Sequence, residues 1–488
     1  MLRNQIRTYS YITIVVSAFM LLMFKYFQHD DLYLAFFDDD FFYYVQTIKQ
    51  SFRSGFITFD GSTATNGFHP LWFAFLSFIA LVFDFGISLF VVVNLITMLL
   101  SLIVFKNCLD ILKDNFNFED FYSSFASLFI SFLYLLISKG GMEIILTIPL
   151  LTYLIKYLTS DYKISSLKLG FIFSLCFLSR LDTVFFLLLL LIYVFKYRKE
   201  FNSLKFILGL TPSILYIFSN LYFYNLLMPI SGLAKQLKSS YLPVSNTFES
   251  LISINPNQII YSLIPLCCVV ISLVLTSILK FNNRLKHLAF ISISFPIIFL
   301  LYNSIVSGWG LWPWYYYIFI SSQIIFFILI YPYLKTFQKS LWQLNIIFIV
   351  AWSLGFGVTK QGTDYDNYNG AKKIQNICLE KDGVFAMGDR AGLVSFLIDK
   401  PIIQTEGLLM DKEFIQLMKS VDLEFLLAKY NVNYYISSFP TYISENKWYV
   451  EEPHKNNPYQ IVCSDTLFQS PQDSVIVNTW KYYIFKMD

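Results

Sequence analysis

Apolar segments of helical length recur along most of this chain, and they constrain its fold more than any other feature. They lie near residues 8–27, 86–105, 121–138, 142–158, 165–179, 183–196, 204–224, 258–279, 286–304, 314–334 and 341–358. A straight membrane span needs about 20 apolar residues, and inside a bilayer helices satisfy their own backbone groups. Only 14% of the residues are charged, whereas soluble proteins are closer to a quarter charged. We therefore expect an α-helical polytopic membrane protein with about eleven transmembrane helices.

The positions of Lys and Arg predict how these helices are oriented. Basic residues gather in 156–168, 196–205, 280–286 and 335–339, and such loops remain in the cytoplasm. The alternate loops then face outside: 139–141, 180–182, 225–257, 305–313 and the tail from residue 360. This alternation of inside and outside loops requires residues 68–83 to dip into the outer leaflet, or to lie on it, without crossing. The first segment follows Arg3 and Arg7 and is read as a retained span.

The composition changes after residue 359. Residues 360–488 are polar, with β-like runs such as GVFAMGD and VIVNTWKYYIFKM around a helical stretch near 411–430. We expect a transmembrane domain over 1–359 and a small extracytoplasmic α/β domain over 360–488. The net charge of +3 is too small to favour a nucleic-acid partner.

Three consecutive carboxylates, Asp38 to Asp40, stand out in the first external loop, residues 28–85. Residues 41–53 after them have the spacing of an amphipathic helix, which suits an interfacial or re-entrant position anchored by its aromatic side chains. Capping and the helix dipole explain one or two of the carboxylates. Three of them favour a further role, a general base with a neighbour that orients an acceptor or a metal.

The sequence DDDFFYYVQTIKQSFRSGFITFDGSTATNGFHPLW (38–72) resembles the first external loop of bacterial C-type (GT-C) glycosyltransferases. Members commonly read DD-x-aromatic-Tyr-Tyr and, after a turn, Thr-Asn-Gly-x-His-Pro-Leu-Trp. Looser similarities lie at 140–150, 178–186, 220–238 and 388–408, with Leu181 where Pro is usual and Asn225 where Gly is common. The basic residues place all five stretches outside, and that argument used none of them.

The resemblance implies sugar transfer from a polyprenyl-phosphate donor in the bacterial cytoplasmic (inner) membrane to an extracytoplasmic glycan, lipid or protein. It implies Asp39 as the base and Asp40 as its partner, or the reverse, with Asp38 as a cap. The departing phosphate needs cations, and Arg180 and Lys235 are the candidates. Arg180 could instead pair with Asp182. Lys235 could be a solvated loop residue or contact membrane lipids.

Several further residues are candidates for binding the acceptor or the sugar, and each has a plainer explanation. Glu143 suits a helix start, His69 a structural hydrogen bond and Asn66 a turn. Trp312 and Trp314 suit an aromatic belt, and Tyr43 belongs to the Tyr-Tyr pair of the resemblance. A divalent cation, Mg²⁺ or Mn²⁺, could bind Asp39 and Asp40, although relatives of this type also work without a metal.

Two other classes of protein remain open from the sequence. A transporter or lipid flippase would more often show internal repeats and charged residues deep within its spans, whereas most charge here lies in loops. A polysaccharide ligase or polymerase of the cell envelope would not use the carboxylates of the first loop in the same way.

Overall fold

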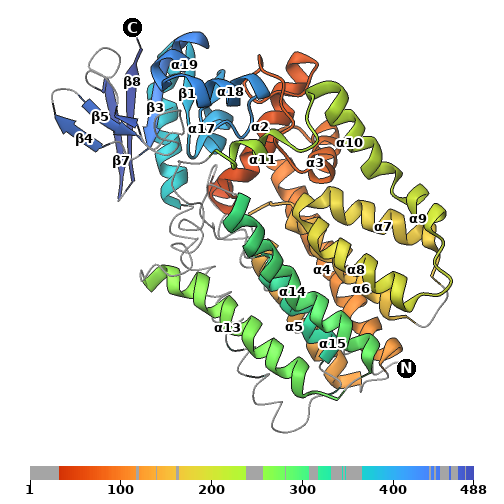
Figure 1. Ribbon diagram of the computed structural model, residues 1–488. Helices are drawn as coiled ribbons and strands as arrows, with labels where there is room; N and C mark the ends of the chain where they lie inside the picture. The colour runs from red at the N-terminus through yellow and green to blue at the C-terminus, as the bar shows by residue number, and fades with distance from the viewer. Residues whose placement is uncertain are drawn as a thin grey trace.

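The computed structural model describes most of the chain in two connected parts (Figure 1). Apolar helices form one part. The other part consists of the α/β tail, which lies beside the segment 32–82. The described residues are 32–116, 120–138, 140–160, 164–237, 256–280, 282–306, 317–330, 365–438, 441–444, 447–450, 461–462, 471–478 and 480–487, with 333, 343 and 347.

The apolar helices coincide with the expected segments to within a few residues. They are α4 (Ile87–Asp110), α5 (Asp120–Ser138), α6 (Ile144–Thr159), α7 (Ser166–Ser179), α8 (Val184–Tyr197), α9 (Ser203–Gly209), α10 (Thr211–Tyr224), α13 (Pro256–Ile278), α14 (Asn283–Val306) and α15 (Tyr317–Ile330). By length and composition, two described helical stretches are long and apolar enough to cross a membrane, 87–113 and 283–306. The expected segments 8–27 and 341–358 lie outside the described residues, so the count of eleven stays a prediction.

The expected apolar segment over 204–224 is not one continuous helix. It consists of α9 and α10, which are bent by 57° at Leu210. Pro212 lies in the first turn of α10. A proline there needs no hydrogen-bond donor, but within a continuous helix it would remove one bond and clash with the preceding turn. The bent pair counts as one more span only if both helices cross together.

Residues 28–85, which the sequence predicts to form the first external loop, contain η1 (Leu32–Phe36), α2 (Asp39–Ser54) and α3 (Pro70–Val82). The amphipathic helix is confirmed as α2, but its expected anchoring in the membrane interface by aromatic side chains is wrong. Phe41 and Phe42 are fully buried and their rings contact Phe90 of α4, because the tail and α4 enclose the helix. Asp38 occupies the N-cap position of α2, although its side chain makes no capping hydrogen bond.

The tail is an α/β unit, as expected. Its main sheet has the order β2-β1-β3-β8-β7, in which β1, β2 and β3 are parallel and β8 and β7 are antiparallel to their neighbours. The strands are β1 (Val384–Met387), β2 (Ile402–Gln404), β3 (Val432–Ser438), β7 (Asp473–Val477) and β8 (Trp480–Lys486). A second, three-stranded sheet contains β4 (Thr441–Ser444), β5 (Lys447–Val450) and β6 (Ile461–Val462).

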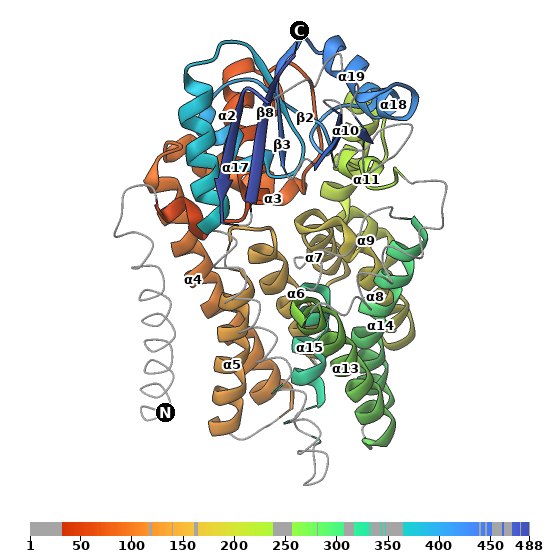
Figure 2. The same ribbon diagram turned by 90° about the vertical axis from the view of Figure 1, so that its left-hand side faces the viewer.

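Helices of the tail connect the parallel strands and face the first external loop. α17 (Ala391–Ile398) joins β1 to β2, and the helical stretch near 411–430 is two helices, α18 (Lys412–Ser420) and α19 (Leu423–Lys429). α17 packs against α2, and α18 packs against the short helix α11 (Ile230–Ala234) (Figure 2). The tail therefore covers the acidic end of α2.

Candidate active site

Asp39 lies in the first turn of α2 and points at the first turn of α17. Its Oδ2 accepts a hydrogen bond from the backbone N–H of Gly392 at 3.0 Å, and its Oδ1 accepts one from Leu393 at 2.9 Å. The first N–H groups of a helix have no partner within the helix and attract anions. The tail thus binds both oxygens of Asp39. Burial nevertheless raises the pKa of Asp39 to about 6, against the lowering effect of these bonds.

Asp40 has a different environment, although it is the next residue. Within the described part of the chain its carboxylate accepts no hydrogen bond, and its side chain, like that of Asp39, is half-buried. Burial, and then the negative charge of Asp39, raise the pKa of Asp40 to about 7, while the positive charge of Lys235 lowers it. A carboxyl with a pKa near neutrality can take and release a proton under ordinary conditions.

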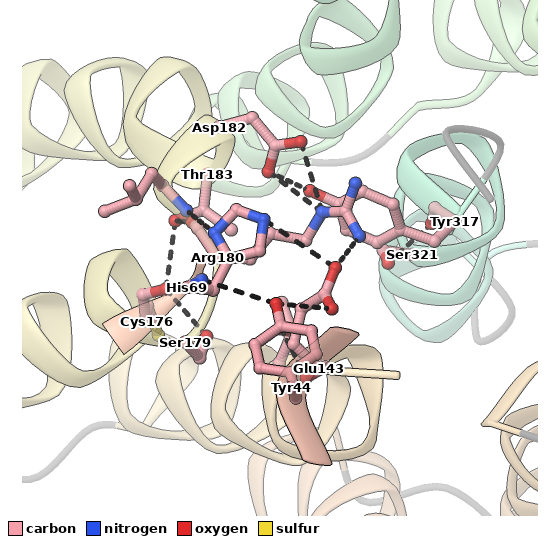
Figure 3. A network of polar contacts seen from close by, with 12 residues as sticks. Tyr44, His69, Glu143, Cys176, Ser179, Arg180, Asp182, Thr183, Tyr317 and Ser321 are labelled. Carbon is pink, nitrogen blue, oxygen red and sulfur yellow. Dashed lines mark hydrogen bonds and ion pairs between the residues drawn. The ribbon is translucent and has the colours of Figure 1, made fainter. Parts of the chain in front are cut away.

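Tyr44, further along α2, belongs to a buried polar network (Figure 3). Arg180, in the turn after α7, forms ion pairs with Glu143 and with Asp182. Its guanidinium also lies over the Tyr317 ring, 3.8 Å from the centroid. Tyr44 of α2 donates its hydroxyl hydrogen to Glu143 Oε2 at 3.2 Å. The network therefore joins α2 to the turn before α6, to the turn after α7 and to α15.

His69 completes the network in its neutral form. Burial, and then the charge of Arg180, lower the pKa of His69 to about 3. Its Nδ1 accepts the backbone N–H of Leu181 at 3.3 Å, so we assign the ring proton to Nε2. That atom lies 3.7 Å from Glu143 Oε1. His69 thus makes the hydrogen bond that its plainer explanation requires, and acceptor or sugar binding by His69 stays a prediction.

Three of the remaining predicted site residues, Asn66, Tyr43 and Lys235, lie within the described part of the chain. Asn66 is buried and connects loops, because its Oδ1 accepts the N–H of Ile230 at 2.9 Å and its amide donates to Asn220 at 3.2 Å. Tyr43 is buried with its ring 5.7 Å from that of Phe59. Lys235 follows α11 directly, and its charge acts on Asp40 and His69. Trp312 and Trp314 lie outside the described residues.

This geometry bears on the alternatives that the sequence left open, an ion pair of Arg180 with Asp182 or phosphate binding, and a helix start or acceptor binding for Glu143. The ion pair of Arg180 with Asp182 is present, and Glu143 adds a second carboxylate that the sequence did not pair with it. Arg180 thus bridges two carboxylates from different parts of the chain, and these ion pairs hold the turns around residues 143 and 180 together. Phosphate binding by Arg180 and acceptor binding by Glu143 stay predictions.

Sequence reasoning missed the contribution of the tail to this site. Gly392 and Leu393 act through backbone N–H groups, and Asn367 donates to Asp39 Oδ1 at 3.5 Å. A signal was available, because GVFAMGDRAG reads as a strand, a turn and a helix start, and that arrangement exposes N–H groups. The contact of Tyr317 with Asp182 had no such signal.

The arrangement does not fit a divalent cation held by both carboxylates. The two oxygens of Asp39 already face N–H donors. Within the described residues, no group of three or more His, Cys, Asp or Glu side chains is placed to hold a metal ion. We therefore assign no step of the reaction to a metal ion.

Comparison of whole structures identifies the fold. Neither a protein-family model nor the sequence of a curated protein matches the chain. ArnT from Cupriavidus metallidurans bound to undecaprenyl phosphate aligns with 88% of this chain and 93% of its own, at 11% identity and a TM-score of 0.50. The apo state of the same protein covers 88% and 92%, at 12% identity and a TM-score of 0.51. The chain has the GT-C fold.

An oligosaccharyltransferase from Archaeoglobus fulgidus aligns more weakly with this GT-C chain, at 11% identity and a TM-score of 0.45 over 88% of this chain and 69% of that one. At such low identities the likeness concerns the fold alone. The likeness to ArnT agrees with the family that residues 38–72 resemble. The five stretches of that resemblance also come together at one end of the molecule, through contacts such as that of Asp38 N–H with Gly140 O at 3.0 Å.

Proposed function

We propose that this protein is a membrane glycosyltransferase that transfers a sugar from a polyprenyl-phosphate donor to an acceptor hydroxyl outside the cytoplasmic membrane. The acceptor belongs to a cell-envelope glycan, a lipid or a protein. The GT-C fold and the apolar helices support this proposal. The observation that carries it is the unequal pair of carboxylates, Asp39 engaged by the tail and Asp40 open beside Lys235.

The reaction follows from the open carboxylate. The Asp40 carboxylate takes the proton of the acceptor hydroxyl as its oxygen forms a bond to the anomeric carbon of the sugar. The bond between that carbon and the phosphate oxygen breaks on the opposite side, so the configuration inverts. Polyprenyl phosphate leaves with one more negative charge than the donor carried. Lys235 is the cation we assign to that charge, because a fixed cation stabilises a charge that develops during the reaction.

This assignment chooses between the two orders that the resemblance left open. Asp39 was the favoured base from the sequence, with Asp40 as its partner. An acceptor hydroxyl that donates to Asp39 would have to compete with two backbone N–H groups whose loss would leave a helix end unsatisfied. Asp40 needs no such exchange, and its pKa of about 7 suits a base that works near neutral pH.

The proposal is tested with purified full-length protein, labelled polyprenyl-phosphate sugars and a membrane extract as the source of acceptor. Wild-type protein is expected to remove the label from one donor. Asp40→Asn should lower the rate by about 100-fold to 10,000-fold, the usual contribution of a general base. The matched control is Asp84→Asn, because Asp84 is an exposed carboxylate of the same external loop.

The same assay separates the proposal from the alternatives. A transporter or flippase would move a labelled lipid between leaflets of a vesicle without breaking the sugar–phosphate bond. A ligase that does not use the first-loop carboxylates would keep full activity in Asp40→Asn. Either result would refute the assignment of Asp40 as a base.

A further inference from the structure

The contact between α2 and α17 has a geometry that packing alone does not require. The two helices run in the same direction, because Asp39 at the start of α2 meets the start of α17, and Arg53 near the end of α2 meets Asp399 just after α17. Arg53 binds Asp399 with two hydrogen bonds, at 2.7 and 2.9 Å, and Lys49 pairs with it at 2.8 Å. The helices are thus fixed at both ends.

Aromatic side chains and a glycine bring the two helices close between these ends. The Phe396 ring of α17 lies 5.4 Å from the Phe42 ring and 5.2 Å from the Lys49 ammonium. A Cβ atom on Gly392 would lie 2.2 Å from the backbone oxygen of Asp39 and 2.8 Å from its Oδ2. Only glycine therefore permits the spacing at which the α17 N–H groups reach the Asp39 carboxylate.

We propose that the tail is part of the catalytic centre, in that the first turn of α17 fixes Asp39 and so leaves Asp40 as the carboxylate available to the acceptor. This inference rests on the proposed function. Asp39 and Gly392 are positioning residues in this scheme, since neither contacts the reacting atoms. The tail therefore affects the reaction only by holding Asp39 in place beside Asp40.

The electrostatics agree with this division of roles. The charge of Asp39 raises the pKa of Asp40, because two adjacent carboxylates resist a second negative charge. Release of α17 would expose Asp39 to water, which screens its charge and lowers the pKa of Asp40. The other charged or titratable groups of the described residues that act on the pair are Asp38, Tyr43, Glu143, Lys235, Asp389, Arg390 and Tyr482.

The decisive experiment compares the dependence of transfer on pH in wild-type protein and two variants. Gly392→Ala forces α17 away from α2, and displacements of about 1 Å at such sites cost on the order of 100-fold in rate. Asp39→Asn keeps the shape of the side chain but removes its charge and one acceptor. In both variants we expect a lower maximal rate, and the acid limb of the profile should move down by about one pH unit.

A matched control and a readout that needs no activity complete the design. Gly86→Ala makes the same substitution at the start of α4, where no atom lies within 4 Å of the added Cβ, and should leave the profile unchanged. Amide hydrogen exchange of full-length protein should show Gly392 and Leu393 protected in the wild type and in Gly86→Ala, and exchanging faster in Asp39→Asn.

The outcomes separate this inference from the function it rests on. Wild-type protein that transfers no sugar from any polyprenyl-phosphate donor refutes the proposed function, and the inference with it. An active wild type together with an unshifted acid limb in Asp39→Asn refutes the inference alone. This holds even if Gly392→Ala fails to fold, because Asp39→Asn makes no steric demand.

Discussion

The buried ion pair of Arg180 and Glu143 permits a quantitative test of how the turns around these two residues are held together. The two residues are 3% and 2% exposed. The variant Arg180→Gln removes the positive charge and leaves Glu143 buried without it. Removing one partner of a buried pair destabilises a protein by about 3–5 kcal/mol, because the remaining charge stays desolvated. We expect Arg180→Gln to lose an amount in this range.

A second arginine of the same chain provides the matched control. Arg53 also binds a carboxylate with two hydrogen bonds, but its side chain is 52% exposed and that of Asp399 is 40% exposed. Exposed pairs are worth about 0.2–1 kcal/mol, since water and salt screen them. Lys49 still pairs with Asp399 after the change. The variant Arg53→Gln should therefore lose no more than about 1 kcal/mol.

Thermal unfolding of the purified proteins in one detergent measures the difference. The midpoint should fall several times further for Arg180→Gln than for Arg53→Gln. The double variant Glu143→Gln/Arg180→Gln should be more stable than Arg180→Gln alone, because it leaves one buried charge fewer. Equal shifts for the two single variants, or an Arg180→Gln protein as stable as the wild type, would refute the reasoning from burial.

The transfer rate should fall as the pH falls through about 7, because the raised pKa of Asp40 means that its basic form is lost there. A rate that stays constant from pH 5 to 8 would contradict Asp40 as the base. The variant Gly67→Ala should loosen the tail, since its Cβ would lie 1.9 Å from the backbone oxygen of Leu408. Faster proteolysis of the tail than in the Gly86→Ala control would show this, and equal rates would contradict it.

The sequence predicted those parts of the molecule whose signals are local. Hydrophobic periodicity located the helices, and the acidic stretch marked the start of α2. The bend at Leu210 was also readable, because Gly209 and Pro212 stand on either side of it. The bend was missed because residues 204–224 form one apolar run. Where every face of a helix is apolar, hydrophobic periodicity cannot show where one helix ends and the next begins.

The partners of the acidic residues were not predictable in the same way. The aromatic side chains of α2 were assigned to the membrane interface because burial against lipid and burial against protein look the same in a sequence. The pairing of Arg180 with Asp182 was visible as a local pair, whereas Glu143 lies 37 residues away from Arg180. The N–H groups that bind Asp39 belong to the backbone, so the strand, turn and helix start in GVFAMGDRAG indicate that such groups are exposed but do not identify Asp39 as their partner.

The binding of Asp39 by the tail also has a consequence for how the protein is made. Its two N–H partners are 353 and 354 residues further along the chain. During synthesis the acidic stretch therefore emerges long before the helix that will hold it, and contacts of such sequence separation form late in folding. A ribosome that stops early releases a chain whose Asp39 has never met α17. The contact between Asp39 and α17 therefore forms only after the tail has been translated.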